Sequence, residues 1–320
     1  MKYVFFGTPE FAAAVLEKLM NAGYTPAAVV CNPDEPVGRK QIITPPPVKR
    51  LIVNSKLPIE IFQPATKSEL SAISHKLLAI QPDLAVVAAY GKILPKDILD
   101  IPARGFLNIH GSLLPSYRGA SPIHAAILNG DKETGVTIME VDEEMDHGSI
   151  ISNIKYQISK NDTYESLSRK LAEIGADLLI KTIPDYISGK ITSVPQEHDK
   201  ATYTKIIKKE DGKIDWQKPA EEIERMVRAY HLWPNAWTTW NEKILKILEA
   251  EVSEDKNGHQ IGGVFLLQHS NILENVGMLL SVQCGDGILI IKKLQLEGGR
   301  SLPIEEFLNG HKDFIGSVLK

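Results

Sequence analysis

The first two-thirds of the chain alternate short apolar runs with amphipathic segments, and this alternation constrains the fold more than any other feature. The apolar runs have the length of buried strands, and the segments between them carry apolar residues every three or four positions. Such alternation is typical of right-handed βαβ units, in which helices cover both faces of a mostly parallel sheet. We expect strands at residues 2–6, 27–32, 59–62, 84–88, 106–110 and 136–141, and helices at residues 9–22, 46–56, 67–80, 121–129 and 163–189.

The pattern changes after Gly189. Residues 196–213 are polar and rich in lysine, which is typical of a linker. A short helix at residues 219–230 and short strands separated by Asn- and Gly-containing turns follow, which favours a small antiparallel barrel of the OB type over a generic sandwich. We therefore predict a Rossmann-like, doubly wound α/β domain in residues 1–189, a linker in residues 190–208, and a smaller OB-like β-barrel domain in residues 209–320.

Composition narrows the class of protein further. Lys and Arg total 36 against 40 Asp and Glu, which gives a net charge of −4. This balance excludes a uniformly basic nucleic-acid binder and a highly charged disordered chain. Cys31 and Cys284 lie far apart in apolar runs, which favours buried thiols in a reducing compartment over a disulfide. Because no apolar run approaches the length of a membrane span and no signal-peptide pattern is present, we expect a soluble, cytoplasmic protein that does not bind membranes.

The turn after the first apolar run, at residues 7–9, lies where a dinucleotide-binding site would place its glycine-rich loop. It contains Gly7 but lacks the other two glycines of the pyrophosphate fingerprint, and Pro9 removes an amide donor from the helix that follows. The sequence therefore predicts a dinucleotide-like topology without NAD(P) binding.

Asn108 and His110 are the first pair of residues that could carry chemistry. They lie two apart at the end of a predicted interior strand, so their side chains share one face at the edge where open α/β sheets bind ligands. An amide donor beside an imidazole can stabilise an oxyanion and move a proton near neutral pH. The alternative is a core pair whose polar groups are satisfied by the main chain.

An acidic segment follows at residues 142–146. It is typical of a solvated turn, and its alternating carboxylates also suggest a calcium loop. The loop pattern fails because His147 stands where glycine is required and Asn153 stands where glutamate is required, so we expect no metal. A third interpretation is that Asp146 supplies the carboxylate that orients His110.

These motifs together resemble the signature of folate-dependent formyltransferases. The resemblance rests on Asn108-x-His110, on residues 112–119 and on Asp146-x-Gly148. It extends over nearly the whole chain through residues 6–11, 33–39, 88–95, 135–139 and 233–237. The family fold is a Rossmann-like formyltransferase domain joined by a linker to an OB-like domain, which agrees with the domain boundaries predicted above.

The resemblance implies a donor, 10-formyltetrahydrofolate, and an acceptor amine that attacks the formyl carbon through a tetrahedral oxyanion intermediate. Asn108 would donate a hydrogen bond to the oxyanion. His110 would help to stabilise the oxyanion and protonate the leaving folate nitrogen, while Asp146 would set the tautomer of His110 and relay the amine's proton through water. The folate pocket would be lined by Ser112, Leu113, Leu114, Pro115, Tyr90, Ile93, Val141 and Asp142. For Arg118 we expect a structural ion pair.

Formyltransferases share this catalytic motif, so other residues must select the acceptor. A long loop at residues 33–47 and the additional OB-like domain favour methionyl initiator tRNA. We expect Arg39 and Lys40 in the loop to contact the RNA, together with Lys205, Lys208 and Lys209, and we expect the protein to act as a monomer. The alternatives are a formyltransferase for a nucleotide-linked amino sugar and a non-catalytic folate- or RNA-binding module. We interpret Trp233, Trp237 and Trp240 as core residues rather than as a base-stacking platform.

Overall fold

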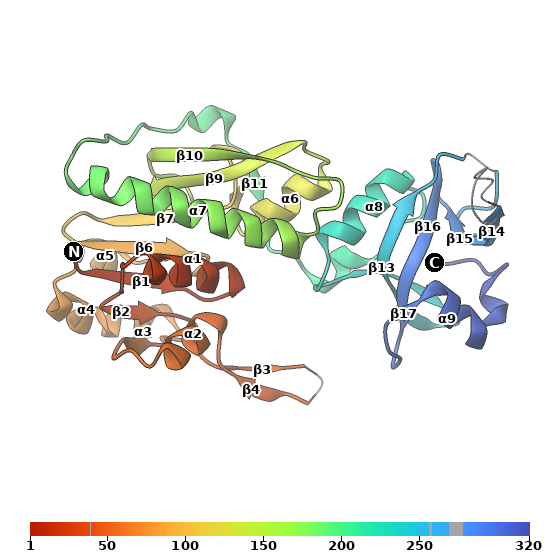
Figure 1. Cartoon of the computed structure of the whole chain (residues 1–320), viewed down its shortest axis with the longest axis horizontal. Coiled ribbons are helices and arrows are strands. Elements are labelled where there is room, and N and C mark those ends of the chain that lie inside the picture. The colour runs from red at the N-terminus through yellow and green to blue at the C-terminus, as the bar shows by residue number, and fades with distance from the viewer. Residues whose placement is uncertain (39, 256–257, 269–277) are drawn as a thin grey trace. The chain divides into compact units, whose positions relative to one another are not determined.

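The structure, a computed structural model, describes residues 1–38, 40–255, 258–268 and 278–320 (Figure 1). The chain divides into two compact units. The amino-terminal unit comprises Met1–Ile123, Lys132–Ile158 and Ser166–Lys205, and the carboxyl-terminal unit comprises His124–Asp131, Ser159–Glu165 and Ile206–Lys320.

The amino-terminal unit is built on one twisted sheet. In the described part of the chain, its strand order is β10-β9-β7-β6-β1-β2-β5. The strands from β7 to β5 in this order pair in parallel, whereas β9 is antiparallel to β7, and β10 is antiparallel to β9. The strands are β1 (Tyr3–Gly7), β2 (Ala28–Val30), β5 (Glu60–Phe62), β6 (Leu84–Ala88), β7 (Phe106–His110), β9 (Glu133–Glu140) and β10 (Ile150–Gln157).

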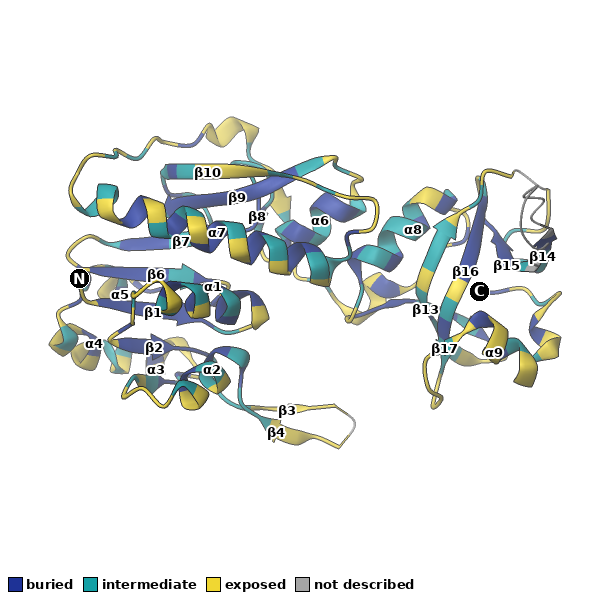
Figure 2. Ribbon diagram, viewed as in Figure 1, coloured by how far each residue is buried: buried dark blue, intermediate teal, exposed yellow. Residues whose placement is uncertain are grey.

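Helices cover this sheet, and their apolar stripes are buried while their outer faces are exposed (Figure 2). In the longest helix, Gly175 lets the backbone approach the sheet, because an added Cβ would lie 3.0 Å from side-chain carbons of Ile109 and Val136. The mostly parallel, doubly wound sheet predicted from the sequence is thereby confirmed. The helices are α1 (Glu10–Asn21), α2 (Pro47–Ser55), α3 (Lys67–Ala72), α4 (Ser74–Ile80), α5 (Lys96–Leu99), α6 (Pro122–Leu128) and α7 (Tyr164–Ile187); the first residues of α7 and most of α6 belong to the carboxyl-terminal unit.

Several local expectations differ from the structure. Residues 67–80 form two short helices that meet at Ile73 instead of one. The predicted loop at residues 33–47 contains an antiparallel hairpin of β3 (Glu35–Val37) and β4 (Ile42–Thr44), which extends away from the main sheet (Figure 1). Strand β10 was not expected from the sequence, because half of its residues are exposed and its sequence forms no long apolar run.

The segment that follows α7 remains in the amino-terminal unit as far as Lys205, before the chain enters the second unit. Its strand β11 (Tyr203–Thr204) pairs in parallel with β8 (Arg118–Gly119). Two short 3₁₀ turns lie on either side of β11, η1 (His198–Lys200) and η2 (Lys209–Gly212).

The carboxyl-terminal unit is built on an antiparallel sheet of order β12-β13-β16-β15-β14, with β17 paired to β16. Residues 317–320 hydrogen-bond to both edges of this sheet: Val264 N–H donates to the Ser317 carbonyl, and Thr239 N–H donates to the Lys320 carbonyl. These bonds close the sheet, in agreement with the predicted small antiparallel barrel. The elements are α8 (Ala220–Ala229), β12 (Ala236–Trp240), β13 (Lys243–Val252), β14 (Val264–Gln268), β15 (Met278–Gln283), β16 (Ile288–Leu296), β17 (Leu302–Pro303), α9 (Ile304–Gly310) and η3 (Lys312–Phe314).

The three tryptophans interpreted as core residues have different environments. Trp240 is buried and packs edge-to-face against Phe307 and Phe314, as expected. Trp237 is half-buried, and its indole N–H donates to the Lys209 carbonyl at 3.1 Å. The prediction is wrong for Trp233, which is 54% exposed because the turn before β12 directs it outward.

Candidate active site

Strand β7 positions Asn108 and His110 on one face of the sheet. Asn108 lies opposite Val87 of β6 and Met139 of β9, and His110 lies opposite Thr137 of β9. Because residues two apart in a strand project to the same side, both polar side chains point to the same face of the sheet. The His110 side chain is 6% exposed, so its ring is held by protein contacts rather than by bulk solvent.

Asp146 reaches this face from the loop between β9 and β10. Its Oδ1 lies 3.4 Å from Asn108 Nδ2 and 3.5 Å from His110 Nδ1. Its Oδ2 accepts a 2.7 Å hydrogen bond from the Gly119 amide, which fixes the carboxylate. The structure therefore brings the three residues predicted as catalytic together around one carboxylate.

The main chain also determines the state of the His110 ring. Its Nε2 lies 2.9 Å from the Tyr117 carbonyl oxygen, which can only accept, so the Nε2–H must donate. With Nε2 directed at the Tyr117 carbonyl, Nδ1 is the ring nitrogen that faces Asp146 Oδ1, at 3.5 Å.

Three non-glycine residues around the site adopt left-handed backbone conformations. They are Ala89 after β6, Tyr117 beside His110, and Asp146, with φ of 46°, 60° and 52°. Such conformations are costly for residues with a Cβ and persist where the surrounding structure holds them, often at functional sites. The strain at Tyr117 and Asp146 lies at the two groups that contact the His110 ring.

The segment predicted to line the folate pocket is held against β9 by Thr137. The Thr137 hydroxyl donates to the Ser112 carbonyl at 2.7 Å and accepts from the Leu114 amide at 3.1 Å. Leu113 packs over Gly135, where an added Cβ would lie 2.5 Å from its Cδ2. Ser112 and Leu114 are buried, and Leu113 and Pro115 are partly exposed.

The remaining four predicted pocket residues are distributed differently. Tyr90 is buried and shares an apolar cluster with the partly buried Val141. Ile93 is 60% exposed. The Asp142 carboxylate is used within its own loop, where Oδ2 lies 2.6 Å from His147 Nδ1. The structure thus brings Tyr90 and Val141 together but gives Asp142 a local partner.

Arg118 does not form the expected ion pair, and that expectation is wrong. Its guanidinium is buried, and no carboxylate lies within salt-bridge distance in the described part of the chain. It donates instead to Gln196 Oε1 through Nε at 3.1 Å and Nη2 at 2.8 Å, to His198 Nδ1 at 2.8 Å, and to the Tyr203 hydroxyl at 3.3 Å. These partners lie in residues 196–203, a segment that its composition predicted only to be a polar linker.

Sequence reasoning also missed several residues that shape the site. Gly119, Tyr117 and Thr137 contact the predicted catalytic or pocket residues through the main chain or a hydroxyl, and Gln196 contacts the Asp146 loop. A hydrogen bond made by a main-chain group does not depend on the type of residue, so it cannot be predicted from the sequence. Gly119 is the exception, because its φ of 104° favours glycine and a glycine within the motif of residues 112–119 can be recognised in the sequence.

The residues predicted to contact RNA are exposed where the structure describes them. Arg39 lies outside the described residues, and Lys40, Lys205, Lys208 and Lys209 are exposed. None of these four ammonium groups forms an ion pair within the described ranges. In contrast, Arg228 of α8 is used internally, because it pairs with Glu224 at 2.6 Å.

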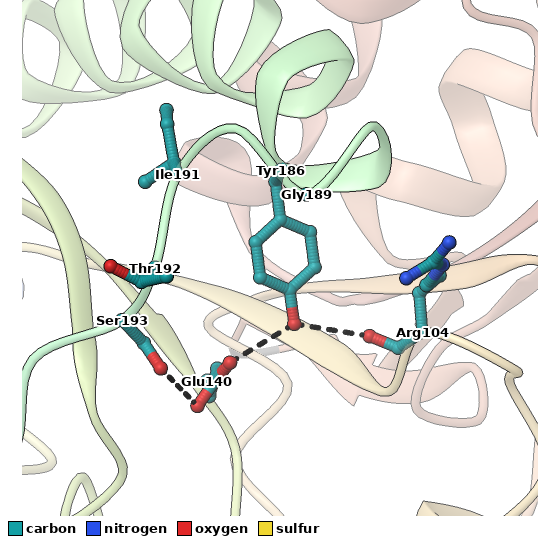
Figure 3. A pocket seen from close by; sticks show the side chains of 7 residues that line it. All are labelled: Arg104, Glu140, Tyr186, Gly189, Ile191, Thr192 and Ser193. Atoms are coloured by element: carbon teal, nitrogen blue, oxygen red, sulfur yellow. Dashed lines mark hydrogen bonds between the residues drawn. The ribbon is translucent and has the colours of Figure 1, made fainter.

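A separate cleft of about 450 Å³ in the amino-terminal unit is lined by Arg104, by Glu140 at the end of β9, by Tyr186 of α7 and by residues just after α7 (Figure 3). The Tyr186 hydroxyl donates to Glu140 at 3.1 Å, and the Ser193 hydroxyl donates to the same carboxylate at 3.0 Å. Burial and the adjacent Glu140 raise the pKa of Tyr186 to about 12, so the phenol remains a neutral donor. None of the predicted site residues lines this cleft.

Sequence comparison assigns the family. The sequence model described as formyl transferase matches residues 1–183, and the model described as formyl transferase, C-terminal domain, matches residues 206–312. This chain belongs to the formyl transferase family. Its two-unit structure is therefore that of a formyl transferase with the carboxyl-terminal domain of the same family.

Curated relatives of this formyl transferase match it over its full length. A methionyl-tRNA formyltransferase of Halalkalibacterium halodurans is 42% identical over 100% of this chain and 98% of its own length. A methionyl-tRNA formyltransferase of Caldicellulosiruptor saccharolyticus is 42% identical over 100% of both chains. The similarity therefore includes the carboxyl-terminal unit as well as the sheet that carries Asn108 and His110.

Solved structures share the fold at lower identity. HypX from Aquifex aeolicus, solved with tetrahydrofolic acid, aligns with a TM-score of 0.66 and 17% identity, over 98% of this chain and 48% of its own. WlaRD, a sugar 3N-formyl transferase solved with dTDP and 5-N-formyl-THF, aligns with a TM-score of 0.62 and 22% identity, over 94% and 99% of the two chains. These alignments support the Rossmann-like fold of this formyl transferase.

No helix among the described residues combines the length and hydropathy needed to span a bilayer. Nor do the described ranges contain a group of three or more His, Cys, Asp or Glu side chains placed to hold a metal ion.

Proposed function

We propose that this chain transfers the formyl group of 10-formyltetrahydrofolate to the amino group of methionyl initiator tRNA. The observation that carries the proposal is the convergence of Asn108, His110 and Asp146 on one face of β7, with Asp146 Oδ1 within 3.5 Å of both partners. Full-length relatives 42% identical to this chain are named methionyl-tRNA formyltransferase, which supports this acceptor over other amines.

The residues present fit a folate donor. Tyr90 is 2% exposed, and its hydroxyl has no hydrogen-bond partner among the described residues. Burial raises the pKa of this phenol, so it stays a neutral donor that a polar ring edge could satisfy. Together with the apolar Val141, which packs in the same cluster, Tyr90 provides the mixed lining that a pterin requires. When bound, the donor supplies an activated formyl carbon and a nitrogen leaving group.

The chain's own residues then stabilise charge and move protons. Asn108 Nδ2 donates to the formyl oxygen as that oxygen becomes negative during attack by the acceptor amine. His110 exchanges its contact with the Tyr117 carbonyl for one with the substrate, so that Nε2–H stabilises the same oxygen and then passes its proton to the leaving nitrogen. Asp146 faces Nδ1 and sets the tautomer of His110; it accepts the proton of the amine through water and passes it to Nδ1, so the ring ends neutral. The Gly119 amide keeps the carboxylate in place throughout.

The acceptor RNA is bound by basic residues outside the chemical site. Lys40, Lys205, Lys208 and Lys209 are exposed, and their ammonium groups are available to phosphates. We place the reaction in the cytoplasm and in a monomer. Support for a reducing compartment comes from Cys31 and Cys284, both within the described residues, which are free thiols whose pKa is raised to about 12 by burial.

A direct transfer assay tests this function. The protein is incubated with 10-formyltetrahydrofolate and either methionyl initiator tRNA or a dTDP-linked amino sugar, and the formylated product of each acceptor is quantified. We expect product only with the charged tRNA. Product only with the sugar would identify the chain as a sugar formyltransferase, and folate or tRNA binding without product would identify a binding module; either result overturns the proposal.

A further inference from the structure

The segment that follows α7 runs along the loop that carries Asp146 and contacts it at successive points. In addition to the bond from Ser193 described above, Val194 and Ile150 exchange two main-chain hydrogen bonds of 2.8 Å. The His198 ring stacks on His147, with ring centroids 4.0 Å apart and an interplanar angle of 8°. The loop is therefore held from outside by a segment beyond the matched amino-terminal family domain, which ends at residue 183.

Gln196 is the centre of this contact. Its side-chain amide donates from Nε2 to the Asp146 carbonyl at 2.9 Å and to the Gly148 carbonyl at 2.7 Å. Its Oε1 accepts both hydrogen bonds from the Arg118 fork. Both donors and both acceptor sites of the amide are thus used in a side chain that is 5% exposed.

The oxygen and the nitrogen of the Gln196 side-chain amide bind different partners. The cationic fork of Arg118 can only donate, so it forces Oε1 toward itself and Nε2 toward the loop. The loop backbone also lies close to the end of β9, since a Cβ added at Gly148 would overlap the Glu140 carbonyl. Asp146 is therefore held at its carbonyl by Gln196 and at its carboxylate by Gly119.

We propose that Gln196, oriented by Arg118, is a positioning residue that sets the Asp146 carboxylate against Asn108 and His110. The inference rests on the proposed formyl transfer, since it assigns Gln196 a role in that reaction through Asp146. It also explains why a buried guanidinium lacks a carboxylate partner among the described residues: a glutamate at position 196 would pair with Arg118 but would face two carbonyl oxygens without a donor.

A double-mutant cycle measures whether Gln196 acts through Asp146. We expect Gln196→Met to lower kcat about 10- to 100-fold, because a displacement of about 1 Å in a reacting group costs up to that much. In an Asp146→Asn background the same substitution should lower kcat by no more than about twofold. A loss of equal size in both backgrounds would overturn the inference.

Hydrogen exchange at the Gly119 amide provides a readout that does not need activity. This amide donates to Asp146 Oδ2, so its exchange should accelerate when Gln196→Met releases the carboxylate. Unchanged exchange at Gly119 would overturn the inference even if the wild-type protein formylates tRNA. If the wild type forms no product, the proposed function fails, and the exchange measurement still decides whether Gln196 positions Asp146.

Matched variants separate positioning from folding and charge. Gln196→Glu keeps the contact with Arg118 as an ion pair while removing both donor bonds to the loop, so we expect it to fold and to show the same loss of kcat as Gln196→Met. Asn153→Asp introduces the same charge on the exposed face of β10 and should match the wild type in kcat and Gly119 exchange. Wild-type kcat in a folded Gln196→Glu variant would contradict the inference.

Discussion

At the scale of single residues, the candidate site depends on short polar contacts around one carboxylate. Asp146 is within 3.5 Å of Asn108 and His110 and accepts from the Gly119 amide, and the His110 ring is also bound to the Tyr117 carbonyl. Removal of one of these donors therefore leaves the Asp146 carboxylate with one contact fewer while the charge of the site stays the same.

Asn108→Ala tests the donor directly. We expect kcat for tRNA formylation to fall about 100- to 1,000-fold, because the developing oxyanion loses a preorganised hydrogen bond. The melting temperature should stay close to that of the wild type, since Asn108 is only partly buried. Asn153→Ala, on the exposed part of β10, serves as the control. A kcat for Asn108→Ala within about threefold of wild type would remove Asn108 from the mechanism.

Residue types in the strand that ends at His110 were sufficient to predict Asn108 and His110 as a pair. Residue types were not sufficient to predict the contacts of Gln196 or Arg118. Glutamine in a polar stretch is ordinary, and an arginine in a motif is compatible with an ion pair, with substrate or with a buried network. Only the meeting of β8 with the segment after α7 makes these two side chains partners.

At the scale of elements, exposure explains which strands the sequence predicted. Strands β1, β6 and β7 are largely buried and appear as apolar runs. The hairpin strands β3 and β4 are almost wholly exposed, so neither a run nor an alternation marks them. The same applies to β10, an edge strand whose outer residues face solvent.

The contact between α6 and the start of α7 predicts a pH dependence of stability. His124 stacks on Tyr164 with centroids 3.8 Å apart, and burial lowers the pKa of His124 to about 4. His124 therefore takes up a proton near pH 6.5 in the unfolded chain, but only near pH 4 in the folded chain. Because the unfolded state binds more protons between these two values, the free energy of unfolding decreases as the pH falls from 6.5 to 4. We expect this residue to remove about 1–2 kcal/mol between pH 7 and pH 5.

Urea unfolding of wild type and His124→Phe at these two pH values measures the effect. Phenylalanine keeps an aromatic ring against Tyr164 and cannot titrate. Tryptophan fluorescence reports the unfolding of the carboxyl-terminal unit, because all four tryptophans lie in this unit, which also contains His124. If wild type and variant lose the same stability between pH 7 and pH 5, His124 is not the titrating group.

At the scale of the whole molecule, a net charge of −4 limits how RNA can bind. The residues after position 200 are themselves acidic on balance, with 15 basic and 17 acidic side chains. We therefore expect binding to use local groups such as Lys208 and Lys209, which are exposed and form no ion pair within the described ranges.

Salt dependence tests these two lysines. We expect the affinity for initiator tRNA to fall with added salt, and the Lys208→Ala/Lys209→Ala variant to reduce the slope of log Kd against log salt by about 1 to 2. Lys292→Ala is the control, because Lys292 is on the same unit but pairs with Glu251. An unchanged slope in the double variant would place the RNA elsewhere on the surface.

The sequence by itself determined the alternating α/β architecture, the antiparallel second unit and the identity of the polar residues at the end of β7. It could do so because burial imposes a period on apolar residues, and because the motif residues lie close together along the chain. Only the tertiary structure decided what holds Asp146 and which partners Arg118 takes. Those contacts join segments 27 to 85 residues apart through main-chain groups and single polar side chains, and such contacts impose no periodic pattern on the sequence.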